Sequence, residues 1–142
     1  DEALLAGLTH NIGALPILIF ADSLSSDEYS EQDLNLTITA LQGLIGSLIL
    51  KTWGFSDTLQ VVPQNVQKWY GNEQGELDMS DIVLLAKYHS YIGSKSAQKL
   101  PAIYTLPAFQ KLGNNELTPD MSLQTLNDAK QQIAEAMSLF RG

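Results

Sequence analysis

Apolar residues recur at helical spacing along most of the chain, and this pattern predicts an almost entirely helical protein. In residues 1–10, the spacing places Leu4, Leu5 and Leu8 on one helical face. Residues 15–24 are apolar almost throughout and match a strand by periodicity alone, but their helical neighbours favour a helix. Within residues 25–36 we expect a polar turn followed by a short helix. The remaining predicted helices cover residues 40–53, 56–70, 79–92, 107–112 and 118–140.

The clearest of these helices covers residues 40–53. We expect it to be the central buried helix, with Leu48 in the core. Gly43 and Gly46 lie on it at a spacing that lets another helix approach closely. Its wide apolar stripe consists of Leu41, Leu44, Ile45, Leu48 and Ile49.

Capping residues and helix breakers set the expected boundaries. Asp78 or Ser80 can cap the helix of residues 79–92, and Gly93 ends it. Pro63 lies too deep in its segment for a first helical turn, so we expect a kink or a new helix there. Thr118, followed by a proline, marks the start of the last helix. These signals predict an all-α fold, a compact array of about seven helices in one domain over residues 1–142.

Composition narrows the classes of function. The 142 residues carry a net charge of −8, and the eight basic residues are scattered, so we expect no nucleic-acid partner. The chain has no cysteine, which excludes disulfides and thiolate metal sites and favours an intracellular, cytoplasmic protein. The apolar runs look too short to span a bilayer, so we expect no membrane contact. The chain begins inside a helical pattern, and we expect it to be part of something longer.

Few residues suggest chemistry. The sequence shows neither a Ser-His-Asp set with a nucleophile elbow nor a glycine-rich phosphate loop, and its two histidines are His10 and His89. His89, flanked by Tyr88 and Tyr91, is best explained as a partly exposed helix residue. His10 has two explanations that the sequence leaves open: a cap for the carbonyls at a helix end, or part of a degenerate site.

Four segments in order resemble the HDOD domain, a branch of the HD superfamily of metal-dependent phosphohydrolases. They are EALLAGLTHNIGALPIL (2–18), GSLILKTWGFSDTL (46–59), SDIVLLAKYHSYIGS (80–94) and the tail LPAFQKLGNNELTPDMSLQTLNDAKQQIAEAMSLF (106–140). The resemblance implies the C-terminal, HD-like part of such a domain. It also implies that a helical N-terminal half packs on this part.

The resemblance implies a degenerate metal site. In active HD proteins, histidines and aspartates hold one or two metals, which activate a water to attack phosphorus. His10 corresponds to the histidine of the HD pair, but the aspartate corresponds to Asn11. A neutral amide is a poor ligand for a hard cation.

The other ligand positions are also changed. A histidine corresponds to about Gln42, a histidine pair to Val66 and Gln67, and an aspartate to Lys87, which replaces a ligand by a positive charge. The relict positions of the site are therefore His10, Asn11, Gln42, Gln67 and Lys87. With at most one good ligand among them, the resemblance implies no bound metal, no cofactor and no catalytic residue.

The leading functional hypothesis is a non-catalytic bacterial signalling module. We expect it to act through a protein partner, its missing N-terminal half or a second copy in a homodimer. The alternative is a metal-dependent phosphohydrolase that acts on nucleotides or cyclic dinucleotides. A third, weaker possibility is a helical oligomerisation domain unrelated to HD proteins.

Overall fold

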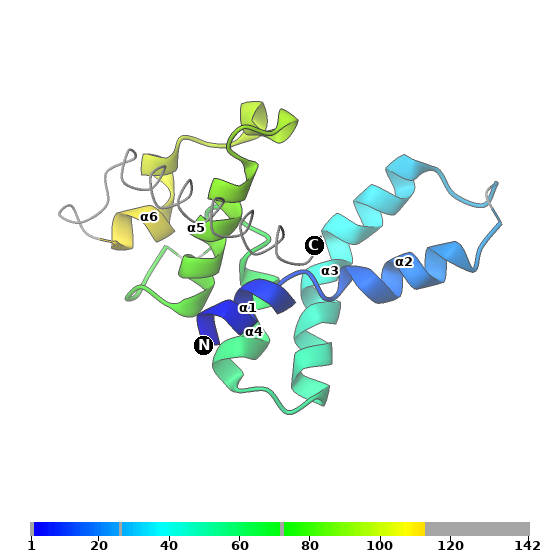
Figure 1. The fold of residues 1–142 in the computed structure, drawn as a ribbon, viewed down its shortest axis with the longest axis horizontal. Helices are drawn as coiled ribbons and strands as arrows, with labels where there is room; N and C mark the ends of the chain where they lie inside the picture. Colours follow the sequence, from blue (N-terminus) through cyan, green and yellow to red (C-terminus); the bar gives the residue numbers. More distant parts are fainter. Residues whose placement is uncertain (1, 26, 72, 113–142) are drawn as a thin grey trace, which may run out of the picture.

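The computed structural model describes residues 2–25, 27–71 and 73–112, and this part of the chain is helical without strands, which confirms the all-α prediction. The helix predicted after Thr118, and Gly113 before it, lie outside the described residues. The α-helices are α1 (Glu2–Thr9), α2 (Ala14–Asp22), α3 (Glu31–Thr52), α4 (Asp57–Asn65), α5 (Met79–Tyr91) and α6 (Pro107–Lys111), with 3₁₀ turns η1 (Lys95–Lys99) and η2 (Ile103–Thr105) between α5 and α6 (Figure 1).

Helix α5 lies at the centre of the body, which we define as α1, α4, α5 and α6, because it contacts each of the other three. Asp78 caps it as predicted: the carboxylate accepts from the backbone N–H of Asp81, and the Asp81 carboxylate accepts from that of Asp78. Gly93 follows the helix end with a φ of +83°. The buried apolar core consists of Ala6, Leu59, Val62, Val66, Val83, Leu84, Leu85, Tyr88, Leu106 and Ala108.

One buried ion pair joins α5 to α6. Lys111 Nζ lies 3.0 Å from Asp81 Oδ2, and the two side chains are only 9% and 2% exposed. Two charges leave water at this contact, so each stabilises the other. The pair therefore fixes the position of the short α6 against the first turn of α5.

The prediction that α3 is the central buried helix is wrong. This helix starts at Glu31, capped by Ser30, and only Gly43, Gly46 and Leu50 are buried along its length. Leu48 is 54% exposed, so it is not in the core of the described structure. The physical reason is that α3 packs through its glycines rather than through its leucine stripe.

The predicted role of the two glycines is confirmed. A Cβ on Gly46 would come within 2.8 Å of the Pro63 Cβ, and one on Gly43 within 3.0 Å of the Gln64 Cα, so α3 and α4 approach closely. On the other side of α3, a Cβ on Gly13 would collide with the carbonyl oxygen of Gln42. Gly13, Gly43 and Gly46 thus allow neighbouring backbone segments to approach the middle of α3 closely.

Of the two alternatives predicted at Pro63, a kink or a new helix, the new helix is wrong. Helix α4 runs through Pro63 to Asn65, and no new helix begins there. Pro63 lies in the last turn of α4, where it removes only one helical hydrogen bond. Its buried ring packs against Gly46, which gives the proline a packing role.

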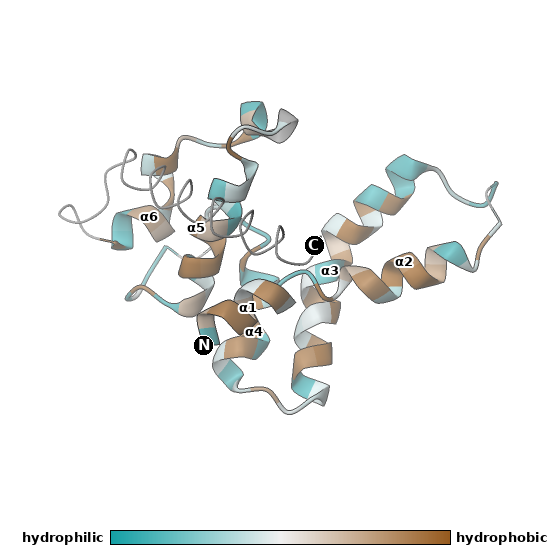
Figure 2. Cartoon of the chain, viewed as in Figure 1, coloured by the Kyte–Doolittle hydropathy of each residue, from teal (hydrophilic) through white to brown (hydrophobic). Residues whose placement is uncertain are grey.

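Helices α2 and α3 form a hairpin that extends away from the body (Figure 1). Helix α2 is apolar along most of its length, as its brown colour shows (Figure 2), but only Ile17 and Ala21 are buried. The exposed apolar residues of α2 are Leu15, Leu18, Ile19 and Phe20. A helix that is apolar all round is normally covered on every side.

Two stretches are long and apolar enough to cross a membrane by length and composition, contrary to the expectation that the apolar runs are too short. They are Glu2–Asp22, with a mean hydropathy of 1.7, and Glu31–Thr52, with 1.4. Core helices of soluble proteins and signal sequences meet the same criteria.

Candidate functional site

The turn after α1, the middle of α3, the end of α4 and the middle of α5 supply the five residues that the HDOD resemblance assigns to a degenerate site. The structure joins three of them, Gln42, Gln67 and Lys87, by direct hydrogen bonds. His10 lies close enough to Lys87 for its charge to affect the histidine. Gln42 and Lys87, 45 positions apart in the chain, thus share one hydrogen-bond acceptor at the junction of the hairpin with the body.

Gln67 is the centre of this cluster. Its Oε1 accepts hydrogen bonds from Gln42 Nε2 at 3.0 Å and from Lys87 Nζ at 3.4 Å. Its Nε2 donates to the carbonyl oxygen of Pro63 at 2.8 Å. Because both ends of the amide are engaged, its orientation is fixed, and Oε1 faces the two donors.

Lys87 carries the positive charge of the cluster. Its Nζ donates to the carbonyl oxygen of Val66 at 2.9 Å and lies 5.7 Å from the centre of the Trp69 ring. Burial lowers the pKa of Lys87 from its ordinary value, since desolvation disfavours the charged form. No carboxylate of the described residues forms an ion pair with it. A carbonyl dipole, an amide and an aromatic face therefore replace the counter-ion of this lysine.

His10 is half-buried and bound to its own helix. Its Nδ1 lies 2.6 Å from the carbonyl oxygen of Gly7, so Nδ1 carries the hydrogen and donates. Burial lowers the pKa of His10, the hydrogen bond to Gly7 acts in the opposite direction, and the charge of Lys87 lowers it further. This contact is the one expected of a histidine that caps the end of α1.

Asn11 stands apart from the other positions. It is exposed, and its carbonyl oxygen accepts from the backbone N–H of Ala14 in the turn before α2. Within the described residues, no hydrogen bond joins its side chain to Gln42, Gln67 or Lys87. Asn11 thus acts here mainly as a turn residue.

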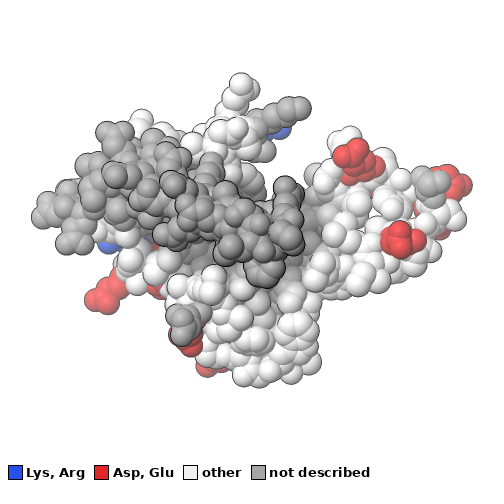
Figure 3. All heavy atoms as spheres, viewed as in Figure 1, with Lys and Arg blue, Asp and Glu red and all other residues white. Residues whose placement is uncertain are grey.

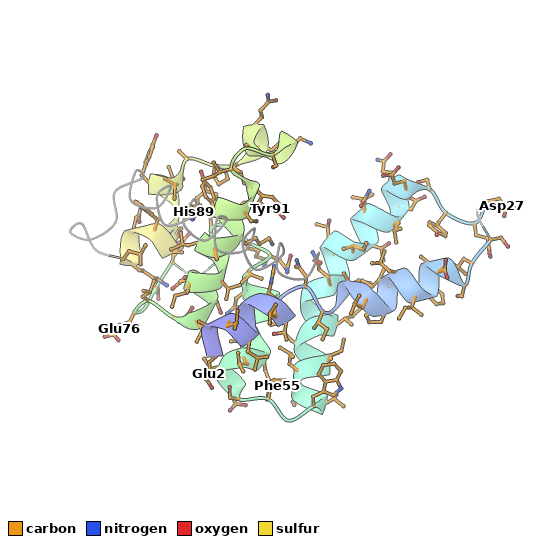
Figure 4. All side chains as sticks on the ribbon, viewed as in Figure 1. Glu2, Asp27, Phe55, Glu76, His89 and Tyr91 are labelled. Carbon is orange, nitrogen blue, oxygen red and sulfur yellow. The ribbon has the colours of Figure 1, made fainter. Side chains whose placement is uncertain are left out.

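The donor set does not fit a catalytic metal. One imidazole, three amides and an ammonium group offer no carboxylate, and hard divalent cations need several oxygen or nitrogen ligands of suitable charge. Among residues 2–25, 27–71 and 73–112, no group of three or more histidines and acids could hold a metal ion. His89 does not alter this, because its Nδ1 is bound to the carbonyl oxygen of Leu85 at 2.7 Å on α5 (Figure 4).

Two features of the site were not predicted from the sequence. Trp69 flanks the Lys87 ammonium, with its ring centre 5.7 Å from Nζ. A shallow pocket of about 390 Å³ lies beside Gln67, between α3 and the end of α4. The glycines in its wall were the available signal, since a missing side chain leaves space; its lining includes Ala40, Gly43, Gln64, Asn65, Lys68 and Gly71.

No protein-family model, curated protein or solved structure matches this chain. The likeness to the HDOD domain therefore depends on the residues and motifs quoted above.

Proposed function

We propose that this chain is a non-catalytic bacterial signal-transduction module with a degenerate HD-type site, which acts in the cytoplasm through contacts with other proteins. The observation that carries the proposal is the position of Lys87. Its ammonium group is hydrogen-bonded to Gln67 and Val66, at the position where the HDOD resemblance expects a carboxylate ligand.

The electrostatics of the cluster support this proposal. A divalent cation beside the Lys87 ammonium would meet repulsion in a partly desolvated region, where charges are weakly screened. His10 shares that positive environment, because the charge of Lys87 also acts on its ring. This repulsion acts against a metal-activated water and hence against phosphodiester hydrolysis.

The experiment measures metal content and hydrolysis together. The purified chain is incubated with iron, manganese or zinc, desalted and subjected to elemental analysis, and its activity on bis(p-nitrophenyl) phosphate is followed. We expect less than stoichiometric metal and no turnover above buffer. One or more equivalents of metal, lost on replacement of His10 by Ala, would overturn the proposal in favour of a phosphohydrolase.

A double variant tests whether the two changed positions alone explain the loss. Asn11→Asp combined with Lys87→Asp restores two acids beside His10. We expect no metal to bind, because Gln42 and Gln67 are also changed. The matched control is Lys99→Asp, an exposed lysine on η1 outside the cluster. Metal in the double variant, but not in this control, would show that the rest of the site is intact.

A further inference from the structure

Helix α3 carries an apolar seam that no described element covers. We define the α3 seam as Leu34, Thr37, Leu41, Leu44 and Leu48, which alternate at spacings of three and four residues. Leu41, Leu44 and Leu48 are 42%, 50% and 54% exposed. The close contacts of α3 with α4 involve Gly43 and Gly46, so within the part of the chain that the structure describes the three leucines remain accessible to a further helix.

The spacing of the α3 seam specifies the kind of partner. Residues at alternating intervals of three and four form the narrow stripe through which two helices pack side by side with interlocking side chains. Leu34, Leu41 and Leu48 are seven residues apart, and Thr37 and Leu44 lie between them at the second position of the same repeat. The seam is thus suited to another long helix of matching length.

Charged residues of opposite sign lie at the two ends of the α3 seam. Asp33 lies one residue before it and Lys51 three residues after it, and both are exposed. They are 18 residues apart, which is five turns of an α-helix, so they project from the same side of α3 about 27 Å apart along its axis. One end of the seam is acidic and the other is basic.

These charges favour an antiparallel second copy as the partner. When two α3 helices pair in opposite directions about a two-fold axis near residue 42, each Asp33 lies beside the Lys51 of the other copy. Parallel pairing would instead place Asp33 beside Asp33. It would also bring together the acidic tips of the hairpins, at Asp27 (Figures 3 and 4); the acids of one tip are Asp22, Asp27, Glu28, Glu31 and Asp33, without a basic residue between them.

We infer that the α3 seam is a self-association surface through which two copies of this chain pair antiparallel. This inference deepens the proposed function, because it names the protein that the module contacts. The α3 seam includes none of Gln42, Gln67 and Lys87, although Gln42 lies on the same helix. Covering the seam removes apolar surface from water, and the two charge pairs select the direction of pairing.

The test uses charge reversal in the 142-residue chain. In Lys51→Glu alone, both contacts become repulsive, and so do both contacts in Asp33→Lys alone. We expect each variant to dimerise about tenfold more weakly than the parent in sedimentation equilibrium at low salt. An equimolar mixture of the two restores attraction at both ends, so the mixed dimer should form at parental strength.

Matched controls separate pairing from side effects. Lys99→Glu makes the same change in net charge away from the seam and should leave association unchanged. Asp33→Asn removes the capping carboxylate of α3 without adding a positive charge, which separates capping from repulsion. Leu44→Gln should abolish the dimer, whereas Leu36→Gln, at an exposed leucine off the seam, should retain it.

A chain that remains monomeric at micromolar concentration would overturn the inference, as would single variants that pair as strongly as the parent. Binding of a monomeric chain to phosphatidylcholine vesicles would assign the seam to a lipid surface and would also overturn it. None of these results changes metal content or hydrolysis. Failure of the self-association is therefore distinguishable from failure of the non-catalytic assignment.

Discussion

Gly46 of α3 lies directly against Pro63 of α4, so closely that a Cβ on the glycine would come within 2.8 Å of the proline Cβ. A buried proline ring is stiff and cannot move aside as a flexible side-chain end can. The crossing of α3 and α4 therefore depends on the absence of a side chain at residue 46.

Gly46→Ala should lower the free energy of unfolding by about 1–2 kcal/mol, because overpacking outweighs the better helix propensity of alanine. Urea denaturation followed by circular dichroism measures the change. The matched control is Gly7→Ala in α1, where a Cβ meets nothing within 4 Å and alanine should stabilise by about 0.5–1 kcal/mol. Equal effects at the two glycines would show that the crossing tolerates a methyl group.

Alanine substitutions at Leu50 and at Leu48 should change the free energy of unfolding by very different amounts, although the two residues lie two positions apart on α3. Leu50 is fully buried, so Leu50→Ala should cost about 2–5 kcal/mol of unfolding free energy. Leu48 is 54% exposed, so Leu48→Ala should change it by about 0.5 kcal/mol or less in a monomeric, dilute sample. A large loss at Leu48 under these conditions would mean that the chain itself covers the leucine stripe.

Removing one partner of the buried ion pair should strongly lower the free energy of unfolding. Lys111→Met removes the cation that lies 3.0 Å from the buried Asp81 carboxylate, and we expect a loss of about 3–5 kcal/mol in the free energy of unfolding. Adding Asp81→Asn, which keeps a hydrogen-bonding side chain at the start of α5, should recover part of this loss. The exposed Lys99→Met is the control, with an expected change of about 0.5 kcal/mol or less. If Lys111→Met resembled this control, the pair would contribute nothing to stability.

Stability should rise with pH through the titration of His10. Its folded pKa lies below the ordinary value of 6.5, so the unfolded chain binds more protons between these two values. The penalty for charging His10 is fully present below the folded pKa and disappears as the pH approaches 6.5. Its cause is the burial of the ring, to which the charge of Lys87 adds.

The measurement is urea denaturation at a series of pH values for the parent and for His10→Gln. The variant should show a smaller rise over this window, because the titrating ring is absent. His89→Gln serves as the control and should keep the rise that His10 provides. A His10→Gln variant with an unchanged pH profile would contradict the assigned burial of His10.

The local features of the fold were well predicted from sequence where a single residue decides them. Asp78 has the short side chain that caps a helix, and Gly93 adopts a positive φ as a helix end requires. Gly43 and Gly46 were assigned to close packing for the same local reason. Each of these residues has a property that few other residue types share.

The face of a helix that packs on the rest of the protein could not be predicted in this way. Helix α3 carries a leucine stripe and a glycine face, and both are compatible with burial, so its own sequence does not decide which one packs on the body. The new helix expected as one alternative at Pro63 is absent because the effect of the proline depends on where α4 ends, which tertiary packing sets. The contacts of Gln67 and Lys87 depend on side-chain rotamers, so the sequence could place these residues in one region only through the HDOD resemblance.

Within the described residues, the hairpin of α2 and α3 is held to the body beside Gly13 and Gly46, and its outer part has few buried apolar residues. Backbone amides of residues 18–25 and 27–38 should therefore exchange with deuterium through local openings, at a lower free energy than amides of α5, which open only in global unfolding. Pairing of two α3 helices would add protection that depends on protein concentration. In that case the stability of the hairpin tip depends on protein concentration, whereas the body is stabilised by its own core.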